Sequence, residues 1–174
     1  MSWRWAILPG STTWSRHWRA GIEVTLRLFF YGTLGEGMDN PVITPMRPKL
    51  GPPQAAFVHG VLYALPDRDG WYPGLLADAR GAPVRGVLYQ PGETFTAADL
   101  AALDSYEAFD PQDEGASEYV RRLVDVTTAS GEEVTAHAYL YNRPLPQGAR
   151  RIEQDSFAGF LAAGGLRALA PRDP

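Results

Sequence analysis

A short turn is the first part of the sequence whose residues could do chemistry. An apolar, aromatic run of residues ends at Tyr31-Gly32-Thr33-Leu34. Because Gly32 has no Cβ, the backbone N–H groups of such a turn can lie close to a ligand, and adjacent amides bind anions such as carboxylates. Taken alone, these four residues are also typical of an ordinary turn that ends a strand.

Glu107 is the second candidate, as a residue that moves protons. It lies at the C-terminal end of a predicted helix, where the helix dipole and apolar neighbours both raise the pKa of a carboxyl group. A raised pKa suits a general base that works near neutral pH. Spacing alone does not select Glu107 over Glu114 or Glu118, and a solvated glutamate at a helix end is the simpler alternative.

Other catalytic motifs are missing from the sequence. It has no nucleophile elbow, no zinc-protease motif, no Walker A loop and no dinucleotide-binding glycine pattern. It also has no cysteine, which excludes thiol nucleophiles and cysteine-bound zinc. The histidines His17, His59 and His137 are too far apart in the sequence to suggest a metal site or a catalytic triad. We therefore expect no bound metal.

Length and charge argue against further classes of protein. A chain of 174 residues, 45% of them hydrophobic, is the size of one domain. Its net charge of −4 and its scattered basic residues argue against a nucleic-acid partner. No apolar run reaches the ~18–20 residues that cross a bilayer, so we expect no membrane span. A monomer in the cytoplasm is the default expectation.

The first 22 residues differ in composition from the rest of the chain. They contain three arginines, four of the five tryptophans and no acidic residue. Proline and glycine interrupt the only candidate for a secretory signal. We interpret residues 1–23 as an extension that is disordered or wrongly included, with translation beginning at Val24. A segment that docks on a partner is the alternative.

Short strands are expected to position the turn. The first, residues 26–31, enters it directly, and a proline-rich loop with at most a short helix follows over residues 35–56. Strands over 57–65 and 83–90 each contain a glycine followed by β-formers. Such a glycine is typical of a bend that curls a small sheet into a barrel, although a twofold repeat would also explain the similarity.

A hairpin and two helices complete the expected elements. β-formers alternate over residues 120–126 and 134–140 on either side of a turn signal, which predicts a β-hairpin. A capping motif and helical spacing predict a helix over residues 97–106. A second, short helix is expected to follow Asp155 and to stop at Gly164-Gly165, which supplies a glycine cap.

Together these elements predict one α+β domain over residues 24–165. Its architecture is expected to be a small mixed β-barrel or curled sheet with a few flanking helices. A doubly wound parallel sheet fits less well, because only one good helix lies between strands. Residues 166–174 are expected to form a loose tail.

Seven short motifs occur in an order that is similar to a known family. They are FFYGTL (29–34), HGVLY (59–63), WYPGLL (71–76), VRGVLY (84–89), LDSYE (103–107), EYVRRLVDV (118–126) and AYLYN (138–142). Over about residues 26–142 this order resembles the γ-glutamylcyclotransferase family, specifically its AIG2-like branch. The resemblance implies a small mixed barrel with flanking helices and a pocket beside the turn at residues 31–34.

The resemblance also implies an activity that needs neither water nor a cofactor. In this family the α-amine of a γ-glutamyl substrate attacks the γ-carbonyl of the same molecule, which releases an amine and 5-oxoproline. By motif, Tyr31, Gly32, Thr33 and Leu34 would hold the α-carboxylate and amino group of this small-molecule substrate, and Glu107 would be the catalytic acid and base. A non-catalytic module that binds an amino-acid-like ligand in the same pocket is the alternative.

Three further residues are placed near the pocket by the resemblance: Tyr119, Arg121 and Tyr139. Strand alternation puts Tyr119 and Arg121 on one face, where Arg121 would pair with a substrate carboxylate while Tyr119 packs over it. A surface arginine beside a tyrosine at the edge of the core is the alternative.

Two positions depart from the family pattern. Ala108 follows Glu107 where the family usually has glycine, so the backbone there must avoid a positive φ or tolerate strain. The proline-rich residues 41–53 replace a helix that often follows the turn. This stretch would border the departing amine, so the identity of that amine is left open.

Overall fold

The computed structural model describes residues 25–34 and 40–170. The expected extension over residues 1–23 and the proposed start at Val24 lie outside the described residues. The elements run in the order β1 (Leu28–Phe30), η1 (Thr44–Lys49), β2 (Gln54–Asp67), β3 (Gly70–Ala77), β4 (Ala82–Tyr89), α1 (Ala97–Tyr106), η2 (Glu114–Ala116), β5 (Tyr119–Thr128), β6 (Glu133–Tyr141), β7 (Arg150–Arg151) and α2 (Phe157–Gly164).

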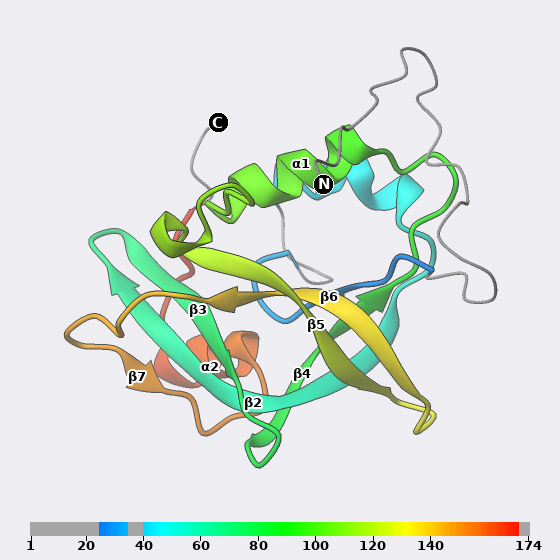
Figure 1. The fold of residues 1–174 in the computed structure, drawn as a ribbon. Helices are drawn as coiled ribbons and strands as arrows, with labels where there is room; N and C mark the ends of the chain where they lie inside the picture. The colour runs from blue at the N-terminus through cyan, green and yellow to red at the C-terminus, as the bar shows by residue number, and fades with distance from the viewer. Residues whose placement is uncertain (1–24, 35–39, 171–174) are drawn as a thin grey trace, which may run out of the picture.

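A closed, mixed β-barrel forms the centre of the described part of the chain (Figure 1). Strands follow the order β2-β4-β1-β6-β5, and β5 pairs back onto β2 to close the ring. The β1–β6 pair is parallel and the other neighbours in the ring are antiparallel. The predicted α+β class and small mixed barrel are therefore confirmed.

One strand, β2, serves both the barrel and an extension of the sheet. Its first half pairs with β4 and its second half pairs with β3, and the change of partner occurs at Gly60. A Cβ at Gly60 would lie only 2.7 Å from the carbonyl oxygen of Leu76. A glycine is needed at this crossing because the two backbones approach too closely for a side chain.

Strand β3 was not among the strands expected from the sequence. It contains Pro73 and two glycines, which disfavour a strand in a central position. Among the strands of the described sheet, β3 pairs only with β2, so it is an edge strand, and a residue without an N–H is tolerated there. The edge position, which depends on the whole sheet, explains why the local pattern was misleading.

Helix α1 begins, and helix α2 ends, at the capping residues that the sequence predicts. Thr96 and Asp99 form the reciprocal capping box of α1, with the Thr96 N–H donating to the Asp99 carboxylate at 2.8 Å. Gly165 ends α2 in the left-handed conformation. Within the described residues, no helix combines the length and apolar character required to span a bilayer.

The hydrophobic core has two parts, and β1 contributes to both. Because side chains alternate along a strand, Phe29 packs into one cluster with α2, while Leu28 and Phe30 pack into the other with Leu103 of α1. The second cluster joins the barrel to α1. It therefore brings the C-terminal end of α1 close to the turn that follows β1.

Residues 166–170 do not form the loose segment that was expected. The Trp71 N–H donates to the carbonyl of Arg167 at 3.1 Å, and the Leu169 N–H donates to the carbonyl of Trp71 at 2.7 Å. The chain pairs with the free edge of β3 here, which satisfies backbone groups that the edge would otherwise expose. Leu169 and Ala170 then reach the pocket described next.

Candidate active site

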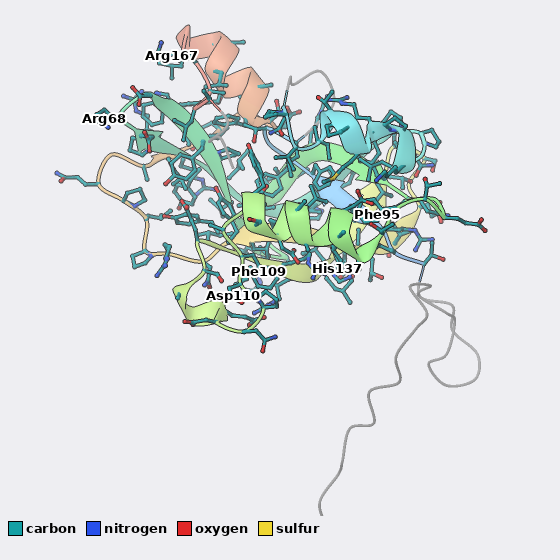
Figure 2. The ribbon with its side chains drawn as sticks, turned by 90° about the horizontal axis from the view of Figure 1, so that it is seen from above. Arg68, Phe95, Phe109, Asp110, His137 and Arg167 are labelled. Atoms are coloured by element: carbon teal, nitrogen blue, oxygen red, sulfur yellow. The ribbon has the colours of Figure 1, made fainter. Side chains whose placement is uncertain are left out.

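A pocket lies where the turn after β1, the C-terminal end of α1 and the start of β5 meet. Figure 2 looks down onto α1 and shows Phe109 and Asp110 just beyond this end of the helix. The lining residues are Phe29, Phe30, Tyr31, Gly32, Thr33, Leu34, Tyr72, Pro73, Tyr106, Glu107, Ala108, Glu118, Tyr119, Tyr139, Leu169 and Ala170. The structure thus brings the predicted turn and Glu107 into one cavity.

The turn at residues 31–34 is held from both sides. A Cβ at Gly32 would collide with the ring of Pro73, so β3 packs directly against the turn. Thr33 Oγ1 lies 3.3 Å from the hydroxyl of Tyr106, which also accepts a hydrogen bond from Asn40 at 2.9 Å. The N–H groups of Gly32, Thr33 and Leu34 donate to no other described residue, so they are available to a ligand.

Glu107 is the residue that caps the C-terminal end of α1, and its half-buried side chain faces the pocket. Burial raises the pKa of its carboxyl group to about 8, and the nearby negative charge of Glu118 is the second cause. The direction agrees with the expectation from the sequence. A carboxyl group with this pKa can both hold and release a proton near neutral pH.

Ala108 tolerates strain rather than avoiding it. Its φ of 48° is in the left-handed region, which favours glycine. The Ala108 N–H donates to the carbonyl of Ser105 at 3.1 Å, and the Phe109 N–H donates to the carbonyl of Asp104 at 2.9 Å. This pair of bonds is the Schellman motif that ends a helix. The motif holds Ala108 in place and so directs Glu107 toward the pocket.

Replacing Ala108 with glycine is expected to stabilise the fold by about 0.5–1 kcal/mol. Glycine removes the ~1–2 kcal/mol cost of a left-handed L-residue, and the greater freedom of the unfolded chain offsets part of that gain. Urea unfolding measures the change. As a matched control, Ala101→Gly in the exposed middle of α1 is expected to destabilise the protein by about 1 kcal/mol. Equal destabilisation by both substitutions would contradict the strain at Ala108.

Tyrosine side chains from the turn and from β5 are fixed in the lining of the pocket. The Tyr31 hydroxyl donates to the carbonyl of Tyr139 at 2.6 Å, and the Tyr119 hydroxyl donates to the carbonyl of Pro73 at 2.6 Å. Burial raises the pKa of both hydroxyls above the usual value, as does the charge of Glu107. Both tyrosines are therefore neutral near pH 7 and act as fixed hydrogen-bonding walls.

Arg121 is not among the lining residues of the pocket. Its guanidinium group binds the carboxylate of Asp104 through two hydrogen bonds, with Nε–Oδ1 and Nη2–Oδ2 distances of 2.8 and 3.3 Å. The Tyr139 hydroxyl donates to the same carboxylate at 2.7 Å. The guanidinium group is thus bound to a carboxylate of the protein itself, and its expected role in binding a substrate carboxylate stays a prediction.

Asp104 is a residue that the sequence reasoning missed. It lies within the LDSYE motif, one helical turn before Glu107, and only 12% of its side chain is exposed. Two contacts to β5 and β6 anchor the last turn of α1 to the barrel. The signal in the sequence was the spacing of three residues between the two acids, which places them on the same side of a helix.

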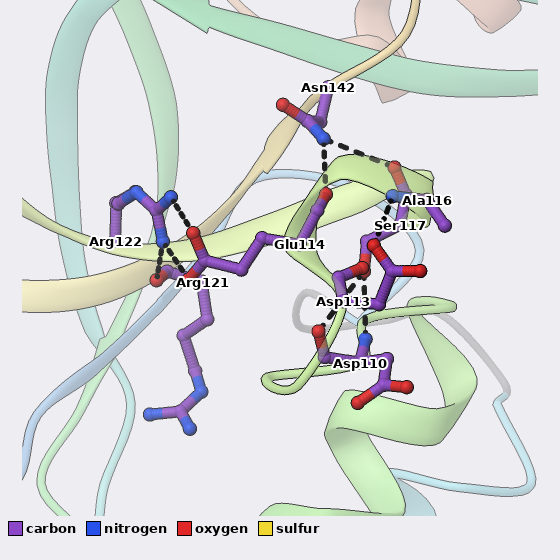
Figure 3. A network of polar contacts seen from close by, with 8 residues as sticks. All are labelled: Asp110, Asp113, Glu114, Ala116, Ser117, Arg121, Arg122 and Asn142. Atoms are coloured by element: carbon purple, nitrogen blue, oxygen red, sulfur yellow. Dashed lines mark hydrogen bonds and ion pairs between the residues drawn. The ribbon is translucent and has the colours of Figure 1, made fainter.

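The structure also separates the three glutamates that spacing could not distinguish. Glu114 forms hydrogen bonds with Arg122 at 2.6 and 2.8 Å, and its carbonyl accepts from Asn142 (Figure 3). This network holds η2 on the outside of the barrel. Glu107 and Glu118 line the pocket and Glu114 does not.

No histidine is among the described residues that line this pocket. No group of three or more His, Asp or Glu side chains in the described ranges is arranged to hold a metal ion. His59 is exposed and its Nδ1 lies 2.9 Å from the carbonyl of Gly81. His137 lies on β6, apart from the lining residues, and burial lowers the pKa of its ring.

Comparisons with known proteins bear on the family and the fold of the chain. A family model described as gamma-glutamyl cyclotransferase, AIG2-like, matches residues 28–158. A search of curated proteins found no match to the sequence.

Several solved structures have a similar fold, among them the following two. An AIG2-like protein from Mus musculus is 20% identical, with a TM-score of 0.61, and the match covers 86% of this chain and 97% of the mouse chain. A protein from Arabidopsis thaliana is 19% identical, with a TM-score of 0.53 and coverage of 84% and 88%. At these identities the likeness supports the fold alone.

Proposed function

Because this chain belongs to the AIG2-like gamma-glutamyl cyclotransferase family, we propose that it cleaves a γ-glutamyl amine or γ-glutamyl peptide to 5-oxoproline and a free amine. The observation that carries this proposal is the position of Glu107. Its carboxyl group, with a pKa raised to about 8, faces the same pocket as the N–H groups of the turn, which pair with no other described residue.

In the proposed reaction the substrate supplies its own nucleophile. Ionised Glu107 takes one proton from the α-ammonium group, and the resulting amine attacks the γ-carbonyl carbon. The new C–N bond closes a five-membered ring. Glu107 then gives its proton to the amide nitrogen as the amide C–N bond breaks, and the carboxylate so formed takes the extra proton of the ring nitrogen and passes it to the free amine, which leaves as its ammonium form. A single carboxyl group can carry both transfers when its pKa is near the working pH.

The turn would contribute binding and orientation. Adjacent N–H groups at residues 32–34 suit the α-carboxylate of the glutamyl group, since backbone amides in such a turn bind anions. Ring closure is intramolecular, so most of the catalytic advantage comes from holding the glutamyl chain in a folded pose. No step requires a cofactor, because every atom of the ring comes from the substrate.

The test is the release of 5-oxoproline from a panel of γ-glutamyl amides and γ-glutamyl peptides by the purified protein. The expected result is turnover of at least one member, and the active member identifies the departing amine. Binding of the panel is measured in parallel. Binding without turnover of any member would overturn the proposed catalytic activity and would support a module that only binds such ligands.

The pH dependence of kcat/KM offers a second test of the role of Glu107. The base must be ionised in the free enzyme, and its pKa is raised to about 8. We therefore expect kcat/KM to rise about tenfold per pH unit below pH 8 and to level off near that value. Initial rates between pH 5 and 9 give the profile. A plateau that begins near pH 5 would exclude a carboxyl group with this raised pKa.

A further inference from the structure

Glu118 is a second carboxylate in the pocket for which the proposed mechanism has no use. It directly precedes β5 and is half-buried. Its N–H donates to the carbonyl of Ala108 at 3.1 Å. This bond joins the end of α1 to the start of β5. It therefore holds Ala108, the neighbour of Glu107 in the chain, close to Glu118.

The Glu118 carboxylate forms no hydrogen bond or ion pair with another residue in the described ranges. Other acids near α1 are paired: Asp99 with Lys49 at 2.6 Å, Asp104 with Arg121 at 2.8 Å, and Glu114 with Arg122 at 2.6 Å. Among residues 25–34 and 40–170, those that line the pocket include no lysine, arginine or histidine. A half-buried anion without a partner is unfavourable, and a cation on the ligand would relieve it.

We propose that Glu118 binds the α-ammonium group of the substrate and thereby makes the pocket selective for α-amino acids over their deamino analogues. The inference rests on the proposed function and adds a specificity residue to it. The α-carbon of a glutamyl group carries two opposite charges. Glu118 would take the positive one, while the N–H groups of the turn take the negative one.

This arrangement also explains how Glu107 becomes a base once the substrate is bound. In the free pocket, burial and the charge of Glu118 keep a proton on Glu107. An ammonium group beside Glu118 offsets that charge, so the pKa of Glu107 falls as the substrate arrives. The base would then be ionised next to the group whose proton it takes.

Selectivity can be measured by calorimetry in the Glu107→Gln background, where the substrate is expected to be consumed only slowly. Two ligands are compared: a γ-glutamyl methylamide and the glutaric acid methylamide that lacks only the α-amine. We expect about ten- to hundredfold tighter binding of the first, because a hydrogen bond to a charged group contributes that much. Adding Glu118→Gln is expected to reduce this preference to about twofold or less.

Two further variants control for general effects. Glu114→Gln removes one negative charge from the same loop, outside the pocket, and should leave the preference unchanged. Glu118→Asp keeps the charge on a shorter side chain and should keep part of the preference. If Glu118→Gln fails to fold, Glu118→Asp still tests the proposal. Its carboxylate lies one methylene further back, so an unchanged affinity for both ligands would contradict the contact between Glu118 and the α-ammonium group.

The outcomes also separate this inference from the proposed function. A preference that survives in a folded Glu118→Gln variant, while the wild type releases 5-oxoproline, would overturn only the role of Glu118. If the wild type releases no 5-oxoproline and binds neither ligand, the proposed function and the role of Glu118 are both wrong. If kcat/KM of the Glu118→Gln variant levels off at a lower pH than kcat/KM of the wild type, this would support the charge coupling between Glu107 and Glu118.

Discussion

The Glu107→Gln variant is expected to release 5-oxoproline about 10²–10⁴-fold more slowly than the wild type, the usual contribution of a general acid and base. Glutamine has the same shape but neither takes nor gives a proton. Initial rates at saturating substrate measure the loss, and calorimetry checks that the substrate still binds. Glu114→Gln, on the outer face, serves as the control and should keep the full rate. An active Glu107→Gln variant would contradict the assigned role.

The same substitution is expected to stabilise the fold at high pH. The pKa of Glu107 is about 8 in the folded protein and ordinary in the unfolded chain, so the folded state binds more protons between pH 4.5 and 8. Wild-type stability therefore falls as the pH rises through this range, whereas a neutral glutamine does not titrate. We expect Glu107→Gln to be about 2–4 kcal/mol more stable at pH 9 and equal to the wild type near pH 4.

Urea unfolding of both proteins at pH 4, 7 and 9 measures this difference. The informative quantity is the change in unfolding free energy between the two proteins, because other titrating groups affect both equally. A difference that stays constant across the three pH values would show that the pKa of Glu107 is not raised in the folded state.

The second large effect is expected at the ion pair beneath α1. Asp104→Ala should lower the free energy of unfolding by about 3 kcal/mol, because it leaves the guanidinium group of Arg121 largely buried without its partner. It also removes the acceptor of the Tyr139 hydroxyl. Since Glu107 lies one turn further along α1, kcat should fall with stability. Urea unfolding and initial rates measure the two losses.

Two comparisons make this prediction specific to a buried pair. Arg122→Ala, which breaks the exposed pair between Arg122 of the same strand as Arg121 and Glu114 of η2, should cost less than about 1 kcal/mol. The double variant Asp104→Leu with Arg121→Met should be far less destabilised than the sum of its single variants, because no charge is left unpaired. Additive losses would mean that the two side chains do not interact.

Local patterns in the sequence were sufficient for most of the fold. The capping residues Thr96 and Gly165, the alternation in β5 and β6, and the apolar run of β1 each act over a few residues, so short windows predict them. Edge strand β3 was missed because Pro73 is acceptable only where the sheet ends, and where the sheet ends depends on all the other strands.

The sequence by itself determined the turn after β1, the helix that ends at Glu107 and, by motif order, the family. Only the tertiary structure decided which charges meet. Spacing could not separate Glu118 from Glu114, and strand alternation could not show that Arg121 faces Asp104. A backbone pattern sets the direction of a side chain, whereas the environment of a charge depends on residues brought close by folding. The tertiary structure therefore placed Glu118 beside Glu107 without a cationic partner in the described pocket, and it paired Arg121 within the protein.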